Sequence, residues 1–137
     1  MTTRILTLCI MLAIAGCRNN DVKVKEVESR MAELYKISQE RNSRQQTLLQ
    51  ADPNATKGMI AVNGVKQFND EYLITLSHKD SALMRVAIDH NVLQKEIEVS
   101  KSGLLRTING IDANSQLVFS KRLDSLLAVI DNSTPIK

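Results

Sequence analysis

Apolar side chains recur along most of the chain at spacings of three and four residues. This is the period of an α-helix that buries one face. The pattern predicts an all-α fold, an antiparallel bundle of about four helices. The four stripes are Val24, Val27, Met31 and Leu34; Ala61, Val65, Phe68, Tyr72 and Leu76; Leu83, Val86, His90, Leu93, Ile97 and Leu104; and Phe119, Leu123, Leu126, Leu127 and Ile130. The aromatic side chains of Tyr35, Phe68, Tyr72 and Phe119 are predicted to lie in the core.

Turn and cap residues separate these stripes. Asp52-Pro53-Asn54 predicts a turn, because proline cannot continue a helix interior and Asp and Asn bond to the local backbone. Ser77-His78-Lys79-Asp80 is typical of a capping box that starts the third helix. Asn109-Gly110 predicts a second turn, and Asp112 is the predicted cap of the last helix.

The segment 58–66 permits two interpretations. Gly58 and Gly64 each cost about 1 kcal/mol inside a helix, and Val62-Asn63-Gly64-Val65 would suit a type I′ β-hairpin. The apolar stripe nevertheless passes Gly64 without changing its period. We therefore expect a helix here, with the hairpin as the alternative.

The first stripe becomes polar in its second half. Its register continues through Ser38, Arg41 and Gln45 before Leu48 restores an apolar side chain. The polar flank 39–46 therefore either projects into solvent or meets a polar partner. The residues Arg41, Arg44 and Gln45 form the candidate interface, and reversing the charge of Arg41 and Arg44 should weaken it with little effect on the fold.

The N-terminus has the order of a signal peptide. A short head with Arg4 precedes an uncharged apolar run from Ile5 to Gly16. As a helix this run would reach about 18 Å, which is too short for the roughly 30 Å hydrocarbon core of a membrane. We expect a cleaved targeting segment rather than a membrane span.

The sequence Ile14-Ala15-Gly16-Cys17 resembles the lipobox of bacterial lipoproteins. The resemblance implies cleavage between Gly16 and Cys17, a diacylglycerol on the Cys17 sulfur, and acylation of the new amine by a fatty acid such as palmitate. In enterobacterial lipoproteins an aspartate after the cysteine favours the inner membrane, whereas residue 18 is Arg. The resemblance thus implies an outer-membrane anchor facing the periplasm.

The expected organisation follows from this anchor. We expect a signal peptide at 1–16, a lipidated tether at 17–22, a helical bundle at 23–132 and a flexible tail at 133–137. A tether of about five residues, at roughly 3.5 Å each, would keep the bundle within about 20 Å of the lipid. The partners expected are membrane lipid through Cys17 and another envelope protein.

Composition narrows the chemistry further. Of the two cysteines, Cys9 lies in the removed segment and Cys17 carries lipid, so the sequence predicts no disulfide and no thiolate site in the mature chain. The net charge of +3 is spread without a dense basic block, which is not typical of a nucleic-acid surface.

No catalytic or metal-binding constellation is predicted. The two histidines, His78 and His90, would lie roughly 120° apart on one helix and could not clamp a metal. The acidic pairs Asp70-Glu71 and Glu96/Glu98 would diverge on a helix surface. We therefore expect a non-enzymatic helical module without a cofactor that binds another envelope protein. The alternative is a bundle that binds a small ligand or cofactor through His90, Met31 or Met84.

Overall fold

A computed structural model describes the backbone from Thr2 to Asn132 and the side chains from Asn20 to Asp131. Within this part the chain forms five helices and one two-stranded antiparallel sheet. In chain order the elements are α1 (Thr2–Ala51), α2 (Ala55–Gly58), β1 (Met59–Val62), β2 (Val65–Phe68), α3 (Asp70–Lys79), α4 (Ser81–Ile108) and α5 (Ala113–Asn132). The helix-dominated fold predicted from the sequence is confirmed.

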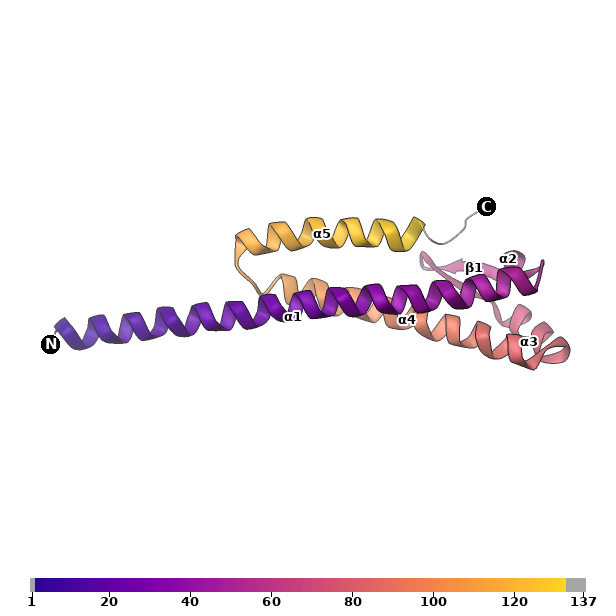
Figure 1. Ribbon diagram of the computed structural model, residues 1–137, viewed down its shortest axis with the longest axis horizontal. Coiled ribbons are helices and arrows are strands. Elements are labelled where there is room, and N and C mark those ends of the chain that lie inside the picture. Colours follow the sequence, from indigo (N-terminus) through magenta and orange to yellow (C-terminus); the bar gives the residue numbers. More distant parts are fainter. Residues whose placement is uncertain (1, 133–137) are drawn as a thin grey trace.

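The long helices give the molecule an elongated shape. Helices α1 and α4 run antiparallel along the long axis, and α5 folds back beside them after the α4–α5 turn (Figure 1). The hairpin, α2 and α3 lie at the opposite end of this rod from the α4–α5 turn.

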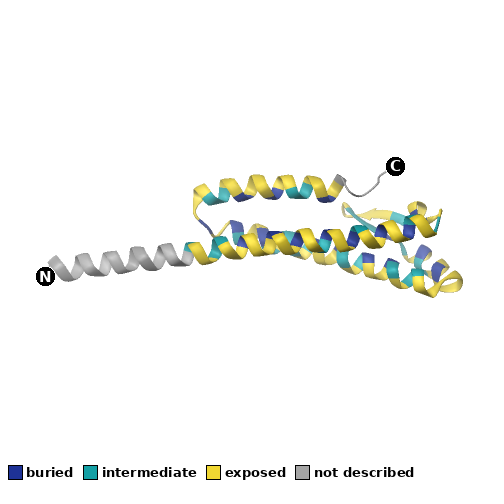
Figure 2. Cartoon of the chain, viewed as in Figure 1, coloured by how far each residue is buried: buried dark blue, intermediate teal, exposed yellow. Residues whose placement is uncertain are grey.

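The core has two apolar clusters. The first is built by α1, α4 and α5, and the second by the end of α1, α2, β2, α3 and α4. Figure 2 shows buried positions along the facing sides of the long helices. The buried members of the first cluster are Val27, Met31, Leu34, Ile97, Leu104, Ile108, Ile111, Phe119, Leu123 and Ile130, and those of the second are Leu48, Ala55, Phe68, Tyr72, Leu76 and Ala87. The prediction that Tyr35 belongs to the core is wrong, because 46% of this residue is exposed.

Residues 59–68 form a hairpin, so the helix preferred for 58–66 is wrong. Met59 pairs with Phe68 and Val62 with Val65, and the two residues between have positive φ angles of 52° at Asn63 and 78° at Gly64. This geometry matches a type I′ turn, which Asn-Gly adopts at low cost. The outer edge of β2 is held by Asn91, whose side chain accepts a hydrogen bond from the Phe68 N–H and donates one to the Phe68 carbonyl, both at 2.9 Å.

The helix starts follow the local cap chemistry. Asn69 caps α3 through Tyr72 N–H, and Asp80 caps α4 by accepting from the N–H groups of Ala82 and Leu83. The predicted cap at Ser77 is wrong, because Ser77 lies inside α3 and its hydroxyl donates to the Ile74 carbonyl. The predicted cap at Asp112 is confirmed, because its carboxylate accepts from the Ser115 N–H at 3.0 Å.

Candidate functional site

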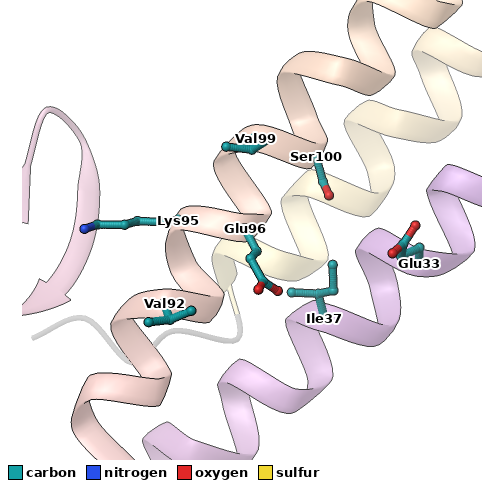
Figure 3. Close-up of a pocket in the computed structure, with 7 residues that line it drawn as sticks. All are labelled: Glu33, Ile37, Val92, Lys95, Glu96, Val99 and Ser100. Carbon is teal, nitrogen blue, oxygen red and sulfur yellow. The ribbon is translucent and has the colours of Figure 1, made fainter.

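A shallow groove runs between α1 and α4, with a volume of about 480 Å³. Figure 3 shows the side chains of Ile37 and Glu96 pointing toward each other between the two helices. The lining residues are Glu33 and Ile37 from α1, and Val92, Lys95, Glu96, Val99 and Ser100 from α4. The groove therefore combines apolar side chains with both signs of charge.

Helix α4 carries a second apolar line on its outward face, beside this groove. Ile88, Val92 and Val99 follow one another at helical spacing, with Lys95 between the two valines. Val92 is 49% exposed and Val99 is 73% exposed. At about 100° per residue, this line lies nearly opposite the core-facing line of His90, Ile97 and Leu104. A line of exposed apolar side chains is typical of a surface that binds a partner.

The predicted interface residues Arg41 and Gln45 do not lie on the surface. They are only 2% and 1% exposed, so the prediction of a solvated polar flank is wrong for both. With Ser38, His90 and Gln94 they form a buried polar layer between the two apolar clusters.

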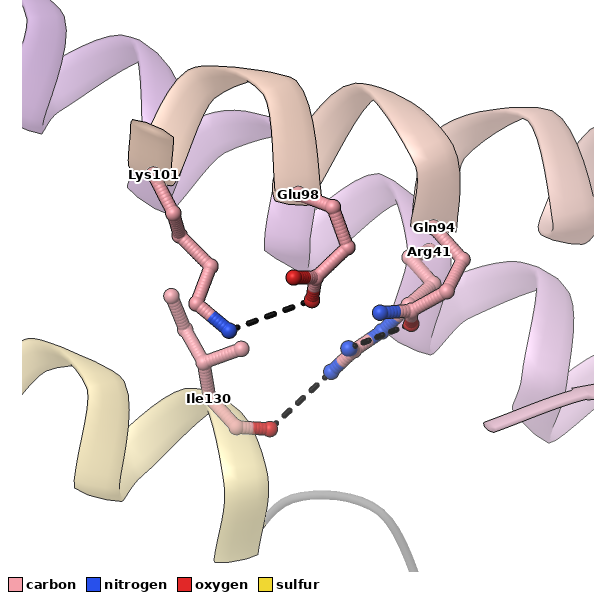
Figure 4. A network of polar contacts seen from close by, with 5 residues as sticks. All are labelled: Arg41, Gln94, Glu98, Lys101 and Ile130. Atoms are coloured by element: carbon pink, nitrogen blue, oxygen red, sulfur yellow. Dashed lines mark hydrogen bonds and ion pairs between the residues drawn. The ribbon is translucent and has the colours of Figure 1, made fainter. Parts of the chain in front are cut away.

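Arg41 ties three helices together. Its Nη1 donates to Gln94 Oε1 at 2.9 Å, and its Nη2 donates to the Ile130 carbonyl at 3.0 Å (Figure 4). Carbonyls in the last turn of a helix have no intrahelical partner, and a cation there is favoured by the helix dipole. Arg41 therefore fixes the C-terminal end of α5 against α1 and α4.

Neighbouring charges support this buried cation. Burial is the largest influence and lowers the pKa of Arg41, while the carboxylates of Asp131 and Glu98 raise it. Glu98 also pairs with Lys101 at 3.1 Å. Together with Lys66, Gly64 and Gln94 these residues line a polar hollow of about 270 Å³.

The burial of Arg41 and Gln45 could have been found from the register. Both continue the α1 stripe of Val27, Met31 and Leu34 without a break, and Leu48 resumes it. Their polar character suggested a solvated face, because Arg and Gln are mostly exposed in proteins.

Arg44 is the one predicted interface residue of the three that is exposed. It follows Glu33 by three helical turns and therefore lies on nearly the same face of α1. A role for Arg44 in an interface with a partner stays a prediction.

His90 is fully buried at the contact of α4 with α1 and β2. Its Nδ1 lies 3.3 Å from Asn91 Oδ1, its Nε2 lies 3.4 Å from Gln45 Oε1, and its ring packs edge-on against Phe68. Burial is the largest influence and lowers the pKa of His90 to about 4, aided by Arg41 and opposed by the Asn91 hydrogen bond. The imidazole is therefore neutral at pH 7.

The neighbours of His90 select its tautomer. The Asn91 side chain is oriented by its two bonds to Phe68, so its Oδ1 is an acceptor and His90 Nδ1 carries the proton. Nε2 then presents a lone pair to Gln45. Among the described residues, Gln45 Nε2 is the one buried side-chain nitrogen or oxygen without a hydrogen-bond partner. Rotating the Gln45 amide by a half-turn allows this Nε2 to donate to the lone pair of His90 Nε2.

The remaining candidate ligands are dispersed. Met31 belongs to the first apolar cluster, Met84 packs against the second, and His90 lies in the polar layer between them. His78 is exposed in the last turn of α3. Among the residues that the structure describes, no three His, Cys, Asp or Glu side chains gather closely enough to hold a metal ion.

The predicted lipidation and cleavage residues, Cys17 and Gly16, lie outside the part whose side chains are described. The tail 133–137 also lies outside the described residues. No helix in the described part has the length and apolar character needed to cross a membrane.

Comparison of the chain with protein-family models, curated proteins and solved structures gave no match.

Proposed function

We propose that the chain is a lipid-anchored protein of the bacterial envelope, held at Cys17, whose groove between α1 and α4 binds a helix of another envelope protein. In this role it is a non-enzymatic accessory module. The observation that carries the proposal is the exposed apolar line of α4, in which Val92 and Val99 line the groove and Ile88 extends the line beyond it.

The spacing of this line favours a helical partner. Residues three and four apart on a helix form ridges that pack into the grooves of a second helix. A helix laid beside α4 would cover Val92 and Val99 with its apolar face and contact Ile37 of α1 with its edge. Recognition of an amphipathic helix in such a groove uses anchors at this periodicity.

Lys95 adds a charge requirement. It interrupts the apolar line between Val92 and Val99, so a partner helix would bring a side chain directly over its ammonium group. A buried like charge would cost several kcal/mol, whereas an acidic side chain would pair with Lys95. The partner helix therefore places Asp or Glu opposite Lys95, whereas a basic side chain is favoured beside Glu33 and Glu96 of the same groove.

The position of Cys17 supports a close membrane anchor. Asn20 is already part of the folded domain, because its side chain donates to Asp112 Oδ1 at 2.8 Å and accepts from the Asp112 N–H at 3.1 Å. Three residues span at most about 11 Å, so the α4–α5 turn lies close to the lipid. From Asn20 to Ala51 an upright α1 would rise about 45 Å, at 1.5 Å per residue. The limit of about 20 Å from the lipid that the tether predicts therefore applies to the end of the domain at the α4–α5 turn, and not to the whole domain.

Site-specific crosslinking in intact envelopes tests this proposal. A photoreactive amino acid replaces Val99 in the groove or, as the control, Val129, which is 58% exposed on α5 and does not line the groove. We expect an adduct with an envelope protein from position 99 and none from position 129. Adding Lys95→Glu should reduce the yield of the adduct. No adduct from position 99, or equal adducts from both positions, would contradict the proposed groove.

A further inference from the structure

Exposed apolar side chains also encircle the basal end of the rod, where α4 turns into α5. They are Val22 of α1, Leu105 of α4, and Leu117 and Val118 of α5, and at least half of each residue is exposed. Leu105 lies three residues before the end of α4, and Leu117 and Val118 lie in the second turn of α5. At 1.5 Å per residue, all four lie within about 8 Å of this end along the helix axes.

The basal end is held together by polar contacts. Asn20 and Asp112 exchange two hydrogen bonds, and Lys23 Nζ donates to the Gly110 carbonyl at 3.3 Å. These contacts fix α1 to the α4–α5 turn. The apolar side chains from three helices are therefore presented together.

We infer that this basal ring, Val22, Leu105, Leu117 and Val118, lies in the headgroup layer of the membrane and contacts lipid directly. The inference rests on the proposed anchor at Cys17, which precedes Asn20 by only three residues. The headgroup layer is roughly 5–7 Å thick on each side of the hydrocarbon core. The backbone from Cys17 to Asn20 is part of helix α1, so these residues lie about 4.5 Å apart along its axis, and the first turns of the folded domain lie at that depth.

A lipid surface explains why the ring is distributed over three helices. A protein partner would cover one side of the rod, whereas a membrane approached end-on meets the basal side chains of every helix. Apolar side chains at this depth lower the free energy of membrane binding in proportion to the area that they bury. The ring thus orients the rod in addition to the attachment through Cys17.

The absence of tryptophan from the sequence permits a direct depth measurement. Single-tryptophan variants Val118→Trp and Val129→Trp of the full lipidated protein are reconstituted into phosphatidylcholine vesicles with and without brominated acyl chains. The two positions are 55% and 58% exposed and lie 11 residues apart on nearly the same face of α5, so they differ chiefly in height above the base. Leu117→Trp supplies a second reporter at the basal height.

We expect bromine quenching and a blue-shifted emission for Val118→Trp and Leu117→Trp, and neither effect for Val129→Trp. Flotation with the vesicles is measured on the same samples. If the protein floats but the tryptophans at positions 117 and 118 stay unquenched, the basal contact is wrong and the anchor stands. The same conclusion follows if the protein floats and the tryptophan at position 129 is quenched equally. Protein that does not float overturns the anchor, and with it both proposals.

Discussion

At the scale of single residues, the polar layer shows which part of the sequence pattern was informative. The register of α1 correctly placed Ser38, Arg41 and Gln45 on the inner face, but their chemistry suggested solvent. Arg41 donates to the neighbouring Asn42 Oδ1, but the acceptors on the other helices lie far away in the chain, 53 residues on at Gln94 and 89 residues on at Ile130. A local pattern could not reveal these partners.

The two neighbouring arginines should respond very differently to charge reversal. Arg41→Glu places an anion near Asp131 and Glu98 and removes the hydrogen bonds that Arg41 donates to Gln94 and the Ile130 carbonyl, so the free energy of unfolding should fall by about 3–5 kcal/mol. Arg44→Glu changes an exposed side chain and should shift it by less than about 0.5 kcal/mol. Urea denaturation of both variants measures the difference, and equal losses would contradict the buried role of Arg41.

His90 should make the stability depend on pH. Its pKa is about 4 in the folded protein and 6.5 as the ordinary value, so between these pH values the unfolded chain binds more protons. The free energy of unfolding should therefore decrease as the pH falls from 6.5 to 4, by up to about 3 kcal/mol from this residue.

His90→Gln isolates this contribution. The variant should lose about 1–2 kcal/mol at pH 7 through lost packing against Phe68, yet show a weaker decline toward pH 4. Denaturant midpoints at several pH values compare the two proteins. An unchanged decline in the variant would show that another group controls the acid response.

At the scale of elements, the long stripes were predicted reliably and the short elements were not. Helices α1, α4 and α5 each bury the stripe expected from the sequence. In the segment 61–76, Phe68 at the end of β2 and Tyr72 and Leu76 in α3 pack into the same apolar cluster, so their spacing of four residues resembles that of a single helix. This spacing therefore did not distinguish a hairpin from a helix. The Asn63-Gly64 turn was the decisive local signal.

The groove was missed although its signal was present. Helix α4 has two apolar lines, and the sequence-based interpretation followed the line through His90 and Ile97 only. The second line, Ile88, Val92 and Val99, becomes meaningful once the structure shows that no described element covers it. Periodicity can reveal such a line but cannot tell which of two faces the fold buries.

Two glycines should respond with opposite signs to replacement by alanine. A Cβ at Gly58 would lie 2.3 Å from Tyr72 Cγ, so Gly58→Ala should lower the free energy of unfolding by about 1–3 kcal/mol through overpacking. At Gly103, inside α4, a Cβ meets only the far end of the flexible Arg30 side chain at 3.2 Å. Gly103→Ala should therefore stabilise the protein by about 0.5–1 kcal/mol.

Thermal unfolding of the two glycine variants checks this pair. We expect a lower midpoint for Gly58→Ala and a higher one for Gly103→Ala. Stabilisation by Gly58→Ala would mean that the contact between α2 and Tyr72 is looser than the structure indicates.

At the scale of the whole molecule, the rod has two distinct ends and one binding side. The α4–α5 turn lies at the end of the three-helix part that is nearest to Cys17 in the chain, and the hairpin lies at the other end (Figure 1). The residues of the apolar basal ring are close to this turn along the helices. The groove runs along the side of α1 and α4 between them. Attachment at the basal end would leave this groove accessible to a neighbouring envelope protein.

The anchor at Cys17 is the central claim, because the basal contact and the location of the partner both depend on it. The intact mass of the protein extracted from membranes tests it most directly. We predict a chain that begins at Cys17 and carries a diacylglycerol with a further acyl chain, and no lipid on the Cys17→Ser variant. A mature chain that begins at another residue, or that retains a free Cys17 thiol, would contradict the account.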